Sequence, residues 1–106
     1  MKEAVSYALK NGYKCVDCAY CYANEDEVGE GLAEAFASGI KREDVFIMSK
    51  VWCTYETSYE RVELALEKTL KSLGLEYLDL FLVVGAHHLS VHTPRHRAFA
   101  PGLMDL

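Results

Sequence analysis

DCAYCYANE, residues 17–25, holds the residues from which both the fold and the chemistry of this chain can be inferred. The stretch follows a short segment that predicts a strand, and it places the carboxylate of Asp17 and the phenol of Tyr22 five residues apart in the loop after that strand. Lys50 ends the next predicted strand and adds an ammonium group. A Tyr beside a Lys and an Asp suits general acid chemistry, because the ammonium favours the phenolate and the carboxylate orients and balances the ammonium.

Helical and extended patterns alternate along the chain around this stretch. Residues 2–11 have apolar positions at helical spacing, and Gly12 stands where a C-terminal cap belongs. Asn24 is expected to cap a second helix that stops at Gly39, and the Ser/Thr-x-x-Glu spacing from Thr57 predicts the start of a third helix. The predicted strands are 14–18, 45–50 and 78–84. Right-handed crossovers between them would give a parallel α/β sheet with helices outside.

Composition narrows the class of protein. The chain has 106 residues, of which 51% are hydrophobic, so it is one globular domain or a piece of one. Its net charge of −5 argues against binding to nucleic acid or to an anionic membrane surface. No apolar run reaches the roughly 20 residues of a membrane span, and the N-terminal stretch lacks a signal-peptide core. We therefore expect a cytoplasmic protein.

Three cysteines form a spacing that allows two interpretations. Cys15, Cys18 and Cys21 follow the C-x-x-C-x-x-C pattern of some metal and iron–sulfur sites. Strand alternation instead puts Cys15 with Asp17 on one face and Cys18 on the other, where a free thiol packs as a small hydrophobe. The structural interpretation is preferred, and no metal site is predicted.

The composition changes near Val84. Residues 85–106 hold all four His and both Pro, and they show no helix or strand period, which predicts an irregular tail. His88, His92 and His96 are four residues apart and would line one face of a helix, but Pro94 disfavours that helix. Adventitious binding of nickel or zinc is the alternative for this segment.

Three stretches together resemble the aldo-keto reductase family. They are GYKCVDCAYCYANEDEVG (residues 12–29), KREDVFIMSKVW (residues 41–52) and SLGLEYLDL (residues 72–80). The resemblance covers residues 1–84 and leaves 85–106 unmatched. It implies a TIM-type (β/α)₈ barrel, of which this chain would carry about three β/α units.

The resemblance also implies a reaction and roles for individual residues. Members of the family reduce aldehydes or ketones with NADPH, or run the reverse oxidation with NADP, on small carbonyl or polyol substrates such as glycerol-type and sugar-type compounds. By position, Tyr22 would donate the proton, Lys50 would make Tyr22 more acidic, and Asp17 would hold Lys50. Asp17 and Lys50 would also contact the cofactor, and Trp52 and Cys21 would line the substrate pocket.

The sequence departs from the family pattern in ways that bear on activity. Cys15 replaces a histidine outside the chemistry, whereas Val84 stands where the family has the histidine that orients the carbonyl. Most contacts to NADPH in the family come from a later half of the barrel. We therefore expect impaired turnover; the alternative is a catalytically inactive fragment that acts, if at all, as an interaction piece. Open sheet edges would favour self-association.

Overall fold

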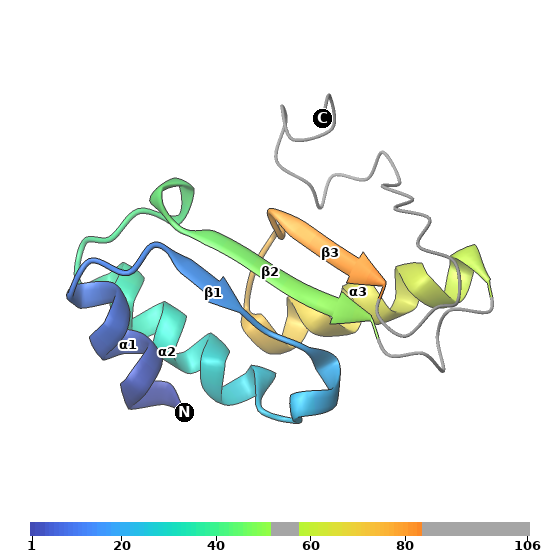
Figure 1. Cartoon of the computed structure of the whole chain (residues 1–106), viewed down its shortest axis with the longest axis horizontal. Coiled ribbons are helices and arrows are strands. Elements are labelled where there is room, and N and C mark those ends of the chain that lie inside the picture. The colour runs from blue at the N-terminus through green and yellow to red at the C-terminus, as the bar shows by residue number, and fades with distance from the viewer. Residues whose placement is uncertain (52–57, 84–106) are drawn as a thin grey trace.

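The computed structural model describes residues 1–51 and 58–83, and its centre is a three-stranded parallel sheet (Figure 1). The strand order is β1 (Cys15–Asp17), β2 (Phe46–Val51) and β3 (Leu80–Val83). Val16 lies opposite Ile47 in one pair of strands, and Lys50 lies opposite Leu82 in the other. The predicted α/β class with parallel strands is confirmed. β1 and β3 are shorter than predicted, and β2 is shifted by one residue. Val84 and the predicted tail lie outside the described residues.

Three helices cover one face of the sheet (Figure 1). They are α1 (Lys2–Lys10), α2 (Glu25–Ala37) and α3 (Tyr59–Leu73), and α2 packs against both of the others. Two short 3₁₀ helices that the sequence did not predict complete the described part: η1 (Tyr20–Tyr22) and η2 (Arg42–Asp44). No helix in these described segments is both long and apolar enough to cross a membrane.

The core lies between the sheet and the helices. Residues of β2 alternate, with Ile47, Ser49 and Val51 buried toward the helices and Phe46, Met48 and Lys50 half-buried on the other face. Side chains with almost no exposed surface, Leu32, Ile47, Leu73 and Leu78, fill the helix-covered side. The sheet therefore has one dry face and one face that the three helices leave uncovered.

Helix ends agree with the sequence in some places and differ in others. The C-cap of α1 is Asn11 and not Gly12 as predicted; Gly12 follows it with φ +94°. Gly74 caps α3 with φ +67°, a conformation that side chains with a Cβ rarely adopt. The cap of α3 is Ser58, whose hydroxyl accepts from the backbone N–H of Arg61 at 3.3 Å. Thr57, from which the cap was predicted, lies outside the described residues. Asn24 holds the N-cap position of α2, but its side chain makes no capping hydrogen bond.

Two glycines let α2 approach its neighbours closely. A Cβ on Gly29 would lie 2.5 Å from the carbonyl oxygen of Ser72 in α3, and a Cβ on Gly31 would lie 2.6 Å from that of Lys2 in α1. Such distances are shorter than real Cβ contacts, so any side chain would force the helices apart. The spacing of the helix layer depends on these two positions.

Arg42 links the segments that lead into β2 and β3 at the amino ends of these strands. Arg42 donates to Asp79 Oδ2 at 2.8 Å and to the carbonyl oxygen of Tyr77 at 3.0 Å, and its guanidinium lies 4.0 Å from the centre of the Tyr77 ring. Asp79 Oδ2 also accepts from the backbone N–H of Ile47 at 2.8 Å. The Arg42–Asp79 pair is largely buried, so it is screened less than a surface ion pair.

Candidate functional site

The predicted site residues meet where β1 and β2 end. Asp17 is the last residue of β1, and Lys50 is the penultimate residue of β2. Because the strands are parallel and adjacent, their carboxyl ends lie at the same edge of the sheet. Tyr22 reaches this edge from η1, which follows β1 after two buried residues, Cys18 and Ala19. The ends of parallel strands in α/β folds are where ligands and chemistry are usually found.

Lys50 is the centre of the site. Its Nζ donates to Asp17 Oδ1 and to the carbonyl oxygen of Cys18, the latter at 3.0 Å. Partial burial lowers the pKa of the Lys50 ammonium, but the hydrogen bond and negative charge of Asp17 outweigh it and leave the pKa above its ordinary value. Lys50 therefore carries a full positive charge at neutral pH.

Tyr22 presents its ring to this charge. The Lys50 Nζ lies 5.5 Å from the centre of the Tyr22 ring, within the range of a cation–π contact. Tyr22 is 55% exposed, so its phenol is open to a ligand. Its backbone N–H donates to the carbonyl oxygen of Ala19 at 3.0 Å, and the next residue, Ala23, is left-handed with φ +52°. A non-glycine residue in that region costs free energy, and such residues cluster at active sites and ligand-binding segments.

The cysteines near the site differ in chemistry. Cys18 is 2% exposed, and burial, with the charges of Glu25 and Asp17, raises the pKa of its thiol to about 12. Cys18 therefore stays protonated and serves the site through its carbonyl oxygen. Cys21 is exposed within η1, and Trp52, the other residue predicted to line a substrate pocket, lies outside the described residues. The pocket-lining roles of both stay predictions.

The cysteine spacing does not gather ligands in the described part of the chain. No group of three or more His, Cys, Asp or Glu side chains there could hold a metal ion. Cys15 and Cys21 are exposed free thiols, and Cys18 is buried. The histidines of the alternative metal hypothesis lie outside the described residues.

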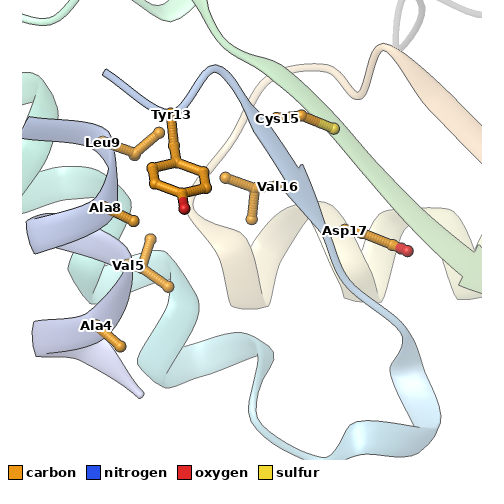
Figure 2. Close-up of a pocket in the computed structure, with 8 residues that line it drawn as sticks. All are labelled: Ala4, Val5, Ala8, Leu9, Tyr13, Cys15, Val16 and Asp17. Atoms are coloured by element: carbon orange, nitrogen blue, oxygen red, sulfur yellow. The ribbon is translucent and has the colours of Figure 1, made fainter. Parts of the chain in front are cut away.

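A hollow of about 240 Å³ adjoins the site, and Asp17 is among the residues that line it (Figure 2). Its walls are mostly apolar side chains of α1 and β1, including Val5, Leu9 and Val16, and Tyr13, Cys15 and Asp17 also line it. Figure 2 shows Val16 directed toward α1, whereas Asp17 points away from the helix. A hollow with apolar walls does not suit a polar substrate, so we assign the chemistry to the strand ends and not to this hollow.

The structure adds one polar group that the sequence did not single out. Glu25 is 6% exposed and accepts hydrogen bonds from Ser49 and Thr69, which are also buried. The available signal was Ser49 itself, a hydroxyl in an otherwise apolar strand pattern, because a buried hydroxyl requires a partner. That signal did not reveal which residue the partner would be.

Comparison with known proteins places this geometry in a family context. The sequence model of the Aldo/keto reductase family matches residues 1–94. A D-galacturonate reductase of Hypocrea jecorina is 65% identical over 83 residues, which are 78% of this chain and 26% of that protein. Aldo-keto reductase family 1 member A1 of Gallus gallus is 51% identical over 89 residues, or 82% of this chain and 27% of that protein. The family match runs beyond residue 84, and the division of the chain at that point stays a prediction.

Solved structures agree with the sequence comparison. The aldose reductase of Schistosoma japonicum matches with a TM-score of 0.74 and 52% identity, covering 77% of this chain and 27% of that one. An aldo-keto reductase of Bombyx mori in complex with NADP matches with a TM-score of 0.73 and 41% identity over the same shares. The chain thus spans about a quarter of the length of the relatives it matches. The described α/β unit corresponds to one part of these larger folds, as the sequence predicted.

Proposed function

Because this chain belongs to the aldo/keto reductase family, we propose that Asp17, Tyr22 and Lys50 form the proton-transferring part of a site for NADP-dependent interconversion of carbonyls and alcohols. The observation that carries the proposal is the meeting of the three side chains. Lys50 contacts the Asp17 carboxylate and lies over the Tyr22 ring, although 33 residues separate Lys50 from Asp17 in sequence.

Each residue has a distinct part in the proposed reaction. The Tyr22 hydroxyl donates its proton to the carbonyl oxygen of the substrate as negative charge develops there. The Lys50 ammonium favours the phenolate that remains, because opposite charges stabilise each other over a short distance. Asp17 fixes the position of Lys50 and balances its charge. In the oxidation direction, the same phenolate takes the proton back from the alcohol.

The residues present fit a nicotinamide cofactor at this edge of the sheet. The Asp17 side chain is 51% exposed beside Lys50, so a carboxylate acceptor and an ammonium donor are both available to polar groups of a ligand. NADPH, when bound, would supply the hydride. Asp17 and Lys50 would be protein groups that contact this cofactor, in keeping with the NADP complex of the Bombyx mori relative.

The substrate class follows from the relatives. One relative is a D-galacturonate reductase and one structural neighbour is an aldose reductase, which makes small sugar aldehydes and their polyols the first compounds to test. We further propose that turnover is impaired in this chain, because Val84 replaces the histidine that the family pattern uses to orient the carbonyl. The cytoplasmic location expected from the sequence stays a prediction.

The test uses the purified 106-residue chain. NADPH binding is followed by fluorescence, and turnover by loss of NADPH absorbance with D-galacturonate or glyceraldehyde. We expect micromolar binding and slow, aldehyde-dependent NADPH loss that Tyr22→Phe abolishes. The matched control is Tyr7→Phe, which removes the same hydroxyl from an exposed position on α1. Turnover that persists in Tyr22→Phe would contradict the assignment.

A second candidate function is supported by the uncovered face of the sheet. By strand register, Met48 shares this face with Leu80, and Phe46 and Leu82 extend it; all four are half-buried. An apolar face of this kind favours association through the sheet, as an interaction piece would use. Sedimentation velocity should then show oligomers that Met48→Glu dissociates. A stable, cooperative monomer would exclude this function.

A further inference from the structure

One buried carboxylate connects three elements around the proposed site. Glu25 is the first residue of α2, and its side chain is buried. Its Oε1 accepts from the hydroxyl of Ser49 in β2 at 2.6 Å, and its Oε2 accepts from the hydroxyl of Thr69 in α3 at 3.1 Å. Ser49 and Thr69 are 0% and 1% exposed, so water cannot replace Glu25 as their partner without a change of packing.

The Glu25 carboxylate and its partner Ser49 are close in sequence to Tyr22 and Lys50. Ser49 directly precedes Lys50 in β2, and Glu25 follows Tyr22 by three residues. The left-handed Ala23 lies between Tyr22 and Glu25 and turns the chain from η1 into α2. The Glu25–Ser49 hydrogen bond therefore ties the segment that carries the phenol to the segment that carries the ammonium.

The choice of a carboxylate over an apolar side chain also needs a reason. Burying a carboxylate is costly, and a well-packed apolar residue would satisfy the core more cheaply. Glu25 accepts through both of its carboxyl oxygens, one from each hydroxyl, so both hydroxyl rotors are directed at the same group. It thus sets one orientation of three elements where apolar packing would allow several.

We propose that Glu25 is a positioning residue that sets the placement of Tyr22 relative to Lys50 by anchoring the start of α2 to Ser49 and Thr69. Its chemical purpose rests on the proposed function, but the placement itself is a property of the folded chain. Glu25 does not reach the reacting atoms; it acts through Tyr22 and Lys50. A site whose groups must be held within about 0.5 Å gains from such an anchor.

The test reads the placement directly and needs no turnover. The Tyr22 ring should shift the NMR signals of the Lys50 ε-methylene protons, because the ammonium lies 5.5 Å from the ring centre. In the full chain with ¹³C-labelled lysine, Lys50→Arg assigns the signals, and Tyr22→Leu gives their position without the ring. We expect Glu25→Gln and Ser49→Ala each to remove roughly half or more of the Tyr22-dependent shift.

The control variant is Glu34→Gln on the same helix. Glu34 accepts from Ser6 at 2.8 Å and from Lys10 at 2.9 Å, and so makes the same kind of bridge between α2 and α1, outside the Tyr22–Lys50 pair. It should leave the Lys50 signals in place. If Glu25→Gln moves them no more than Glu34→Gln does, Glu25 is merely structural and the proposal fails.

Two further outcomes are covered by the same experiment. Should Glu25→Gln not fold, Ser49→Ala decides, because it removes one anchor and keeps the carboxylate; an unmoved Lys50 signal in that variant overturns the proposal. A chain without turnover whose Lys50 signals move in Glu25→Gln contradicts the proposed function alone. A chain with turnover and unmoved signals contradicts the positioning role alone.

Discussion

The ammonium of Lys50 lies over the ring of Tyr22, 5.5 Å from its centre, while it donates to Asp17 and to the Cys18 carbonyl oxygen. The two residues come from different strand ends, so their contact exists only in the folded sheet. Two hydrogen-bond acceptors on the β1 side hold Lys50, and η1 brings Tyr22 to it. The contact is thus a sensitive reporter of how well this edge of the sheet is formed.

Removing the Asp17 charge should lower the pKa of Lys50. Asp17 raises that pKa through a hydrogen bond and its charge, and partial burial, which lowers it, would remain in Asp17→Asn. The ¹⁵N signal of the Lys50 ammonium, followed as the pH is raised, measures the effect. Asp26→Asn, which removes an exposed carboxylate from α2, is the control, and an equal Lys50 pKa in wild type and Asp17→Asn would refute the assignment.

The Glu34 carboxylate should make stability fall with acid. Hydrogen bonds from Lys10 and then Ser6 hold the pKa of Glu34 below its ordinary value of 4.5, so the unfolded chain binds more protons than the folded one. The stability that Glu34 adds is present above about pH 4.5 and is lost as the pH falls through the lowered pKa. The gap in urea midpoint between wild type and Glu34→Gln should therefore shrink from neutral pH to acid. Lys10→Gln should reproduce most of this change, and a gap that does not vary with pH would argue against it.

Cys18 should resist thiol reagents that modify its neighbours. Burial raises the pKa of the Cys18 thiol to about 12, and the thiolate is the reactive form, whereas Cys15 and Cys21 are exposed. Iodoacetamide near pH 8, followed by site-resolved mass spectrometry, should label Cys15 and Cys21 well before Cys18. In urea the three should react alike. Early labelling of Cys18 in the folded chain would mean that β1 opens locally.

Gly29→Ala should destabilise the helix layer. The added Cβ would lie 2.5 Å from the Ser72 carbonyl oxygen. Overpacking of this kind costs about 1–3 kcal/mol, whereas alanine gains roughly 1 kcal/mol over glycine in helix propensity. The cost therefore equals or exceeds the gain. Urea unfolding followed by circular dichroism measures the loss. Glu30→Ala on the exposed side of α2 removes only a surface ion pair with Lys2 at 3.5 Å and should change stability by about 0.5 kcal/mol or less. Equal effects of the two substitutions would count against close helix packing at Gly29.

The helix and strand order could be predicted because it is determined by local sequence patterns. Apolar spacing marks α1 and α3, and glycines with positive φ follow their last turns. The family pattern predicted the candidate site residues; Asp17 is the last residue of β1 and Lys50 the penultimate residue of β2, and their roles stay predictions. Their contact was implied by that pattern, and the structure supplies its geometry.

The remaining features depend on contacts between distant segments. Arg42 and Asp79 are 37 residues apart, and nothing in either local sequence indicates their pairing. The same holds for Glu25 and Thr69, which are 44 residues apart. The left-handed Ala23 was equally out of reach, because alanine has no preference for that conformation and only the surrounding fold imposes it.

The Arg42–Asp79 pair and the Tyr22–Lys50 pair lie at opposite ends of β2, and this separation has a consequence for genetics. A substitution at Arg42 weakens the contact between two strands, so cells would hold less of the protein while each folded molecule kept the proposed site intact. A substitution at Tyr22, which is exposed, would leave the amount unchanged and alter only the proposed reaction. Measuring abundance beside specific activity would therefore assign a variant of this chain to one end of the strand or the other.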